Sequence, residues 1–385
     1  MNRDPLELTS SVLNTIFPHP PADVRVLAAV SGGADSVALL YILHLLASRF
    51  GYTLFAITVD HRMRSEAESG GDAAFVASLC ASLEPPVPCR VSVLDEGAVA
   101  REAAARGRGI EEAARSLRYG EISAEAQRIG ARWIMTGHNR NDNLETILMR
   151  VLQGSGGTAA GGIARRRGSF IRPLLDASRS ELTAWLRSRD ISWREDATNG
   201  DDAYLRNRIR HHVVPALEAA IPGWDTGLLS FAEKARSDDD YCRLSLRMEW
   251  DRNDAGLSCP AAAFSSLHPA LPLRFLRDGL ALLGLAHRVP NGYLERIIRE
   301  TRAGADATSG ATSGADGAFP QQAGLIAGSG LRFERDGDSF FWTPDIVQNY
   351  KSGYLVYITD CGTYSVPCGS VTVTQRQGHY WLDDR

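Results

Sequence analysis

The chain has 385 residues, of which 44% are hydrophobic, and a formal net charge of −4 at pH 7. This length and composition predict a globular protein of two or three domains, each with its own core. No segment approaches the roughly 18 consecutive apolar residues of a membrane-spanning helix, so we expect a cytoplasmic protein with no membrane partner. The weakly acidic balance also excludes a protein covered in positive charge.

The first half of the chain alternates between short apolar segments and helical ones. Strands are predicted at 24–30, 53–59, 87–94 and 132–137. Helical stretches separate these strands along the chain. Strand and helix in turn predict an α/β fold, with a parallel sheet flanked by helices on both faces.

The second half has a different pattern. Residues 204–303 show mostly helical spacing, small residues dominate 303–324, and the remainder alternates like strands. We therefore expect four regions, which are an α/β domain over 1–217, a mainly helical domain over 218–303, a low-complexity linker over 304–329 and a small β-rich region over 330–385.

The sequence SGGADS lies where the first predicted strand ends and a helix begins. Gly32 and Gly33 let the backbone approach an anion, and the N–H groups and dipole of a helix N-terminus attract phosphate. Ser31 and Ser36 add hydroxyl donors. Asp35 would repel a bare phosphate, so it indicates a cation such as Mg²⁺ between the two. The alternative is a tight turn in which Asp35 and Ser36 only cap the helix.

Asp142 and Glu145 lie three residues apart at the start of another predicted helix. This spacing places both carboxylates on one helix face. Such a pair can hold Mg²⁺ on one side and orient an ammonium group for deprotonation on the other. The alternative is that both acids only favour the positive end of the helix dipole.

Two groups of arginines also suit anionic ligands. Arg115 and Arg118 lie three residues apart, and their guanidinium groups could bind phosphates or a leaving pyrophosphate. Arg206, Arg208 and Arg210 recur at a spacing of two, which does not fit one helix face. We expect some of these three to face the site and others to face an anionic polymer. Ordinary exposed helix arginines are the alternative.

These segments together resemble one enzyme family. SGGADS after a strand looks like the pyrophosphate loop of the N-type ATP pyrophosphatases. Five later stretches resemble the tRNA(Ile)-lysidine synthetase family, in the order that this family shows. They are VDHRMRSEAESGGDAAFV, GIEEAARSLRYGEI, TGHNRNDNLETILMRVLQGSG, IRPLLDASRSEL and WREDATNGDDAYLRNRIRHHVVPAL. The resemblance is specific over about residues 24–217 and weaker beyond them.

The resemblance implies a reaction with defined partners. ATP, accompanied by Mg²⁺, would adenylate O2 of the wobble cytidine in a tRNA(Ile) with a CAU anticodon and release pyrophosphate. L-lysine would then displace AMP and leave lysidine. The region 1–217 would be the adenylation domain of this ATP-dependent carbon–nitrogen ligase, and 218–303 would bind tRNA. A homodimer is compatible with the resemblance.

The resemblance also implies roles for individual residues. The residues implied in catalysis are Asp35, Arg115, Asp142, Glu145 and Arg206. Those implied in nucleotide binding are Ser31, Gly32, Gly33, Ala34, Asp35 and Ser36. The implied metal ligands are Asp35 and Asp142, and the implied substrate-binding residues are Arg118, Asn207 and Arg208.

One position departs from the family pattern, because many relatives carry aspartate where this chain has Asn141. The missing charge argues against a metal role at this residue. A related tRNA thiolase is the alternative function, but it would need paired catalytic cysteines, and the six cysteines here include no C-x-x-C pair. A tRNA-binding protein without catalysis would have no reason to combine Asp35, Asp142 and Glu145 with the loop serines.

Overall fold

The structure, a computed structural model, describes most of the first 309 residues and parts of the remainder. The described ranges are 3–17, 24–62, 66–106, 109–154, 160–195, 205–253, 256–285, 289, 291–309, 331–336, 338–344, 362–366, 369–376 and 379–384. The chain divides into two compact units, Met1–Asp239 and Asp240–Arg385, and the boundary falls within one long helix. Each unit has its own hydrophobic core.

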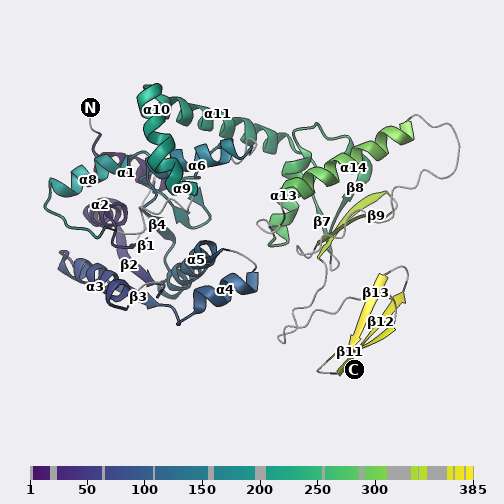
Figure 1. The fold of residues 1–385 in the computed structure, drawn as a ribbon, viewed down its shortest axis with the longest axis horizontal. Helices are drawn as coiled ribbons and strands as arrows, with labels where there is room; N and C mark the ends of the chain where they lie inside the picture. The colour runs from purple at the N-terminus through teal and green to yellow at the C-terminus, as the bar shows by residue number, and fades with distance from the viewer. Residues whose placement is uncertain are drawn as a thin grey trace. The chain divides into compact units, whose positions relative to one another are not determined.

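The first unit is built on a six-stranded sheet with the order β3-β2-β1-β4-β6-β5 (Figure 1). Its strands are β1 (Val24–Ala29), β2 (Tyr52–Asp60), β3 (Cys89–Val93), β4 (Trp133–Thr136), β5 (Arg166–Arg167) and β6 (Phe170–Ile171). All neighbouring strands are parallel except β5, which runs antiparallel to β6. The α/β fold expected from the sequence is therefore confirmed.

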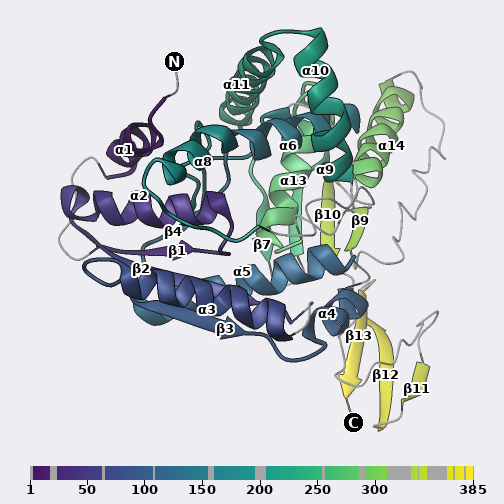
Figure 2. The ribbon, with the colours of Figure 1, turned by 60° about the vertical axis from the view of Figure 1, so that its left-hand side comes forward.

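Helices cover both faces of this sheet (Figure 2). They are α1 (Pro5–Ile16), α2 (Ala34–Phe50), α3 (Glu66–Ser82), α4 (Ala98–Arg106), α5 (Ile110–Ile129), α6 (Arg140–Leu152) and α8 (Arg179–Arg187). Helices α1, α2, α3 and α8 contribute to the core on one face, and α5 packs on the other face.

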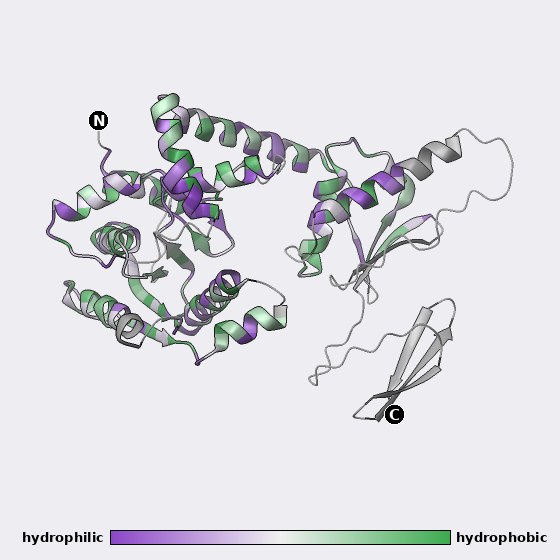
Figure 3. Ribbon diagram, in the orientation of Figure 1, coloured by the Kyte–Doolittle hydropathy of each residue, from purple (hydrophilic) through white to green (hydrophobic). Residues whose placement is uncertain are grey.

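Strand β1 shows why the sheet is covered on both sides. Val24, Val26 and Ala28 face one core, whereas Leu27 faces the other, because successive side chains of a strand point to opposite faces. A strand buried on both faces is apolar throughout, as VRVLAA is apart from its second residue. Figure 3 shows this hydrophobic colouring on the central strands and on α2.

Four helical segments complete the first unit and lead into the second. They are α9 (Leu205–Arg208), the π-helix η2 (Ile209–Val213), α10 (Val214–Ala220) and α11 (Trp224–Ser245). The π-helical turn directly precedes Pro215, which has no N–H to donate and whose ring crowds the carbonyl one turn earlier. The wider turn accommodates this proline within a nearly continuous helix.

The second unit combines helices with antiparallel strands. One four-stranded sheet has the order β7-β8-β10-β9, formed by β7 (Asp251–Asn253), β8 (Gly256–Pro260), β9 (Leu331–Asp336) and β10 (Ser339–Pro344). Its helices are α12 (Ala261–Ser265), α13 (Pro272–Leu282) and α14 (Asn291–Ser309). A three-stranded sheet contains β11 (Gly362–Val366), β12 (Gly369–Arg376) and β13 (His379–Asp384).

The mainly helical and β-rich regions are both present, but the structure arranges them differently from the expected order. Strands β7 and β8 interrupt the expected helical region 218–303, and β8 pairs with β10 from the expected β-rich region. Helix α14 extends to Ser309, inside the expected linker, while 310–330 lie outside the described residues. Among the described helices, none is long and apolar enough to cross a membrane.

Candidate active site

The candidate site lies at the carboxyl ends of β1 and β4, where the strand order of the sheet reverses. Strand β1 pairs with β2 on one side and with β4 on the other. A parallel sheet opens a crevice at such a point, since the connections leave in opposite directions. The loops that follow β1 and β4 lead directly into α2 and α6.

The loop after β1 has the form expected of a phosphate-binding turn. Gly32 has a φ of +88°, a conformation that favours glycine. Ser36 Oγ accepts the Ser31 N–H at 3.1 Å and donates to Gly33 O at 2.9 Å. The N-cap of α2 is Gly33, and no side chain caps it. The serines therefore shape the loop, whereas the alternative of a side-chain cap at Asp35 and Ser36 does not describe this corner.

Asp35 lies at the start of α2 and forms an ion pair that the sequence pattern did not indicate. Its Oδ2 accepts from Arg179 Nη2 at 2.8 Å. Burial raises the pKa of Asp35, and the Arg179 charge opposes that rise. Its Oδ1 is buried and accepts no well-formed hydrogen bond from the described residues, although the nearby Asn139 side chain also lowers the pKa of Asp35. One carboxylate oxygen is thus left for a further ligand.

The carboxylates of Asp142 and Glu145 lie on the same side of α6, as their spacing predicts. Asp142 forms a capping box with Asn139, in which each side chain accepts the other residue's backbone N–H. Arg206 donates to Asp142 Oδ1 and to Glu145 Oε2, both at 2.7 Å. Asp142 therefore does stabilise the start of the helix, as the alternative interpretation expected. Glu145 does not, because its side chain is 3% exposed and pairs with arginines instead.

Arg210 is the second cation at this carboxylate pair. It donates to Glu145 through Nε at 2.7 Å and through Nη2 at 3.0 Å. Arg208 is exposed and Asn207 is half-buried, so Arg206 and Arg210 are the two arginines of this segment that reach the carboxylates. Their separation of four residues is one helical turn, a signal that the sequence already contained.

Arg115 and Arg118 extend from α5 toward the same end of the sheet. Arg115 Nη2 donates to Tyr119 Oη at 3.1 Å, and its guanidinium carbon lies 4.9 Å from that ring centroid. Arg118 Nε donates to His61 Nε2 at 2.9 Å, just after β2. Burial and the Arg118 charge lower the pKa of His61 to about 4.

The pKa of His138 reflects the positive charge of the surrounding arginines. It follows β4 and contacts Thr136 Oγ1 through Nδ1 at 2.9 Å. Burial, together with the charges of nearby arginines, lowers the pKa of His138 to about 3. These arginines are Arg172, Arg115, Arg206 and Arg118. Arg115 and Arg118 lie on α5 and Arg206 on α9, so the fold brings predicted arginines from two helices near this ring.

A cavity of about 600 Å³ adjoins the carboxylate pair. Its lining combines acids, arginines and apolar side chains. The lining residues are Arg140, Asn141, Leu144, Glu145, Ser178, Arg179, Ser180, Arg210, Val214, Pro215, Glu218, Gly223, Trp224 and Asp225. Arg140 and Asp225 form an ion pair of 2.6 Å within this lining, which ties α6 to α11.

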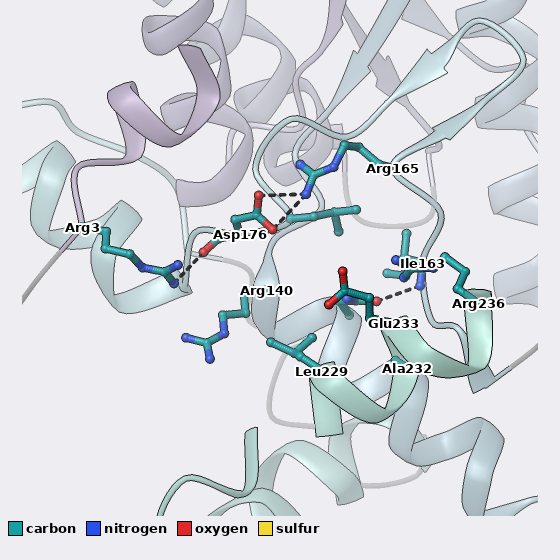
Figure 4. A pocket seen from close by; sticks show the side chains of 11 residues that line it. Arg3, Arg140, Ile163, Arg165, Asp176, Leu229, Ala232, Glu233 and Arg236 are labelled. Atoms are coloured by element: carbon teal, nitrogen blue, oxygen red, sulfur yellow. Dashed lines mark hydrogen bonds and ion pairs between the residues drawn. The ribbon is translucent and has the colours of Figure 1, made fainter. Parts of the chain in front are cut away.

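A smaller cavity of about 260 Å³ lies beside the same end of α6 (Figure 4). Arg165 Nη2 contacts both carboxylate oxygens of Asp176, at 2.9 and 2.8 Å. Asn143 Oδ1 accepts the Ile163 N–H at 2.7 Å. The Asn143 contact holds the segment after α6 against the helix.

Comparison with known proteins places this site in a family. Residues 7–217 match the PP-loop domain family. A tRNA(Ile)-lysidine synthase of Treponema pallidum is 37% identical over 373 residues, which cover 94% of this chain and 77% of that protein. The enzyme of the same name from Treponema denticola is 42% identical over 368 residues, 94% of this chain and 75% of that protein. A U34-tRNA thiolase from Methanococcus maripaludis aligns with 16% identity and a TM-score of 0.48, over 60% of this chain and 79% of that chain.

Proposed function

Because the chain belongs to the tRNA(Ile)-lysidine synthase family, we propose that it joins L-lysine to C2 of the wobble cytidine in a CAU-anticodon tRNA(Ile). ATP drives this ligation by adenylating O2 of the base, and lysine then displaces AMP. The observation that carries the proposal is that Arg179, which binds Asp35 of the SGGADS loop, also lies within the influence of the Asp142 and Glu145 charges. A phosphate-binding turn and a carboxylate pair are the two parts that this chemistry requires.

The first step needs positive charge around the ATP phosphates. Backbone N–H groups at the start of α2 suit these phosphates, and the arginines of α5 suit the leaving pyrophosphate. The positive charges of Arg115 and Arg118 are among those that lower the pKa of His138. Both arginines therefore lie near the end of the sheet that carries the phosphate loop. Adenylation converts the base oxygen into a leaving group, which allows an amine to substitute at C2.

Asp35 fits the Mg²⁺ that accompanies ATP. Among the described residues, no group of three or more His, Cys, Asp or Glu side chains could hold a metal ion alone. Mg²⁺ in nucleotide enzymes commonly takes one or two carboxylates together with substrate phosphates, and the buried, unpartnered Asp35 Oδ1 is a suitable ligand. Both oxygens of the Asp142 carboxylate already accept hydrogen bonds. Asp142 could therefore act as a metal ligand only if Arg206 moved away from it. The bound ion would supply charge neutralisation at the phosphates.

The 600 Å³ cavity has the chemistry of a lysine site. Leu144, Val214 and Pro215 offer apolar surface to the methylene chain. Glu218 lines the cavity and forms no ion pair with the described residues, so its carboxylate can receive an ammonium group. Glu145 belongs to the same lining and can accept the proton that the ε-amine loses before attack.

The tRNA would present its wobble base unstacked from the anticodon loop, since the reacting atom must reach the phosphate loop. Exposed Arg208, one residue from the buried Ile209, is placed to meet RNA phosphates. Tyr119 and Phe170, whose rings are 5.0 Å apart, offer an aromatic surface near Arg115. A cytoplasmic location and a homodimer stay predictions.

The test is incorporation of radiolabelled lysine into an unmodified CAU-anticodon tRNA(Ile) transcript. ATP and Mg²⁺ are each omitted in turn, and a transcript with U at the wobble position serves as the matched control. We expect label only in the complete mixture with wobble C. Conversion of ATP to AMP without lysine incorporation would contradict lysine as the nucleophile while retaining the adenylation chemistry.

A further inference from the structure

Arg179 lies in the stretch IRPLLDASRSEL, where the sequence pattern assigned no role to it, and the fold fixes its backbone position closely. Its backbone N–H donates to Asn141 Oδ1 at 2.9 Å, which ties the start of α8 to the start of α6. Nearby, the Arg140 N–H donates to Ala177 O at 2.9 Å. Its guanidinium group reaches a third helix start, at Asp35 of α2. Three helix N-termini therefore meet around this side chain.

The ion pair between Arg179 and Asp35 has the features of a contact that can exchange. Only one oxygen of Asp35 is engaged, while the other is buried and has no partner among the described residues. By contrast, Arg165 engages both oxygens of Asp176. The Arg179 side chain is also 39% exposed and lines the 600 Å³ cavity, so it has room to move.

We propose that Arg179, which pairs with Asp35 in this structure, is a phosphate-binding residue of the adenylation step and that Asn141 positions it. This inference rests on the proposed function, because it assumes that Asp35 shares a cation with ATP. A cation held by Asp35 would replace the Arg179 guanidinium as counter-charge, and the guanidinium would then be free to bind a phosphate oxygen. Guanidinium donors match phosphate geometry and form charge-assisted hydrogen bonds there.

The charge that Arg179 would offset is that of the leaving group. As the base O2 bonds to the α-phosphorus, the bond from that phosphorus to the bridging oxygen breaks. The electron pair departs with pyrophosphate, which gains negative charge in the transition state. A cation already held beside the loop stabilises this charge without reorganising.

Asn141 has a positioning role in this arrangement, and that role accounts for its departure from the family pattern. Its Oδ1 accepts the Arg179 N–H, and the carboxylate of an aspartate would accept the same N–H. The side chain is therefore needed as an acceptor rather than as a charge. Asparagine and aspartate are equivalent for this purpose.

The experiment measures binding of an ATP analogue with a methylene group between the α- and β-phosphorus, by calorimetry, with Mg²⁺ present or omitted. The full-length protein is compared with Arg179→Ala, Arg179→Lys and Arg187→Ala. Arg187 lies on the same helix, where its guanidinium carbon is 5.6 Å from the Trp193 ring. We expect Arg179→Ala to weaken Mg²⁺-dependent binding about 10- to 100-fold, as for loss of a charged hydrogen bond. Arg179→Lys should restore part of it, and Arg187→Ala should bind normally.

Two further readouts keep this inference separate from the proposed function. Asn141→Asp should bind the analogue like the wild type, and Asn141→Ala should bind it more weakly. Unchanged binding in a folded Arg179→Lys and Arg179→Ala, with only a lower melting temperature, would show a structural ion pair and overturn the inference. If Arg179→Ala does not fold, unchanged binding by Arg179→Lys and Asn141→Ala overturns it. Failure of the wild type to incorporate lysine would instead contradict the proposed function.

Discussion

Arg206 Nε lies 2.7 Å from Glu145 Oε2, although 61 residues separate the two along the chain. Arg210 binds the same carboxylate, and Arg206 also binds Asp142, so two acids and two guanidinium groups form one balanced cluster. A nearly buried carboxylate is stable only when it is paired and hydrogen-bonded. The cluster therefore preserves, next to the phosphate loop, an acid pair that a lysine substrate can use.

Replacing Glu145 by Gln should damage both stability and activity. The substitution removes the direct counter-charge of partly buried Arg210 and one of the two carboxylates that Arg206 binds. We expect the free energy of unfolding to fall by about 3–5 kcal/mol, as when one partner of a buried ion pair is removed. Lysine incorporation should fall about 100-fold or more, because the ε-amine loses its proton acceptor. Chemical denaturation and the tRNA assay measure these two effects.

The matched control is Glu300→Gln, which removes the exposed carboxylate that pairs with Arg296 at 2.6 Å. Exposed pairs contribute little, so this variant should resemble the wild type in both measurements. If Glu145→Gln were as stable and active as this control, the role assigned to the buried pair would be wrong.

Arg210 and Glu145 should be energetically coupled. A double-mutant cycle combines Arg210→Gln with Glu145→Gln and follows the free energy of unfolding. Because each residue is the other's direct partner, the losses should be non-additive by about 1–3 kcal/mol, with the double variant less damaged than the sum. Additive losses would show that the contact contributes nothing beyond each residue alone.

Gly137 and Gly120 should respond to alanine in opposite directions. A Cβ at Gly137 would lie 3.2 Å from the backbone carbon and oxygen of Asp35, so the loop after β4 would have to move away from the phosphate loop. We expect a loss of roughly 1–3 kcal/mol and weaker ATP binding. A Cβ at Gly120, in α5, meets nothing within 4 Å, and alanine there should stabilise the helix by up to about 1 kcal/mol.

Thermal unfolding of both variants and nucleotide titration of Gly137→Ala measure these effects. Equal melting temperatures for the two variants would contradict the close approach between the loops after β1 and β4.

His138 should make the protein sensitive to acid. In the folded protein its pKa is lowered to about 3, whereas an unperturbed histidine has a pKa of 6.5. Between these values the unfolded chain binds the proton and the folded protein does not. The free energy of unfolding therefore falls as the pH drops from 6.5 toward 3.

His138→Gln removes this contribution, so the variant should lose less stability than the wild type over the same pH range. Melting temperatures at a series of pH values between 7 and 4, set within the window of these two pKa values, provide the measurement. Parallel curves for the two proteins would mean that His138 takes up a proton in the folded state.

Residues that act within one turn or one motif could be predicted from the sequence alone. The SGGADS turn, the spacing of Asp142 and Glu145 and the alternation of strands and helices are all set by neighbours a few residues apart. Glycine conformation, helix periodicity and strand periodicity act over that same range. These patterns sufficed to predict the α/β fold and a phosphate-binding loop, whereas the family was indicated by the resemblance of the motifs to known enzymes.

Contacts between distant segments were decided only by the tertiary structure. Arg179 reaches Asp35 across 144 residues, and β8 pairs with β10 from beyond the low-complexity segment. Such pairings depend on how the whole chain closes, and a guanidinium group looks the same in the sequence whether it is exposed or bound to a buried acid. The sequence by itself determined which chemical groups this protein carries and which of them lie at the start of a helix. The packing of α6, α8 and α9 decided which cation meets which carboxylate, because burial makes each unpaired charge costly and so selects its partner.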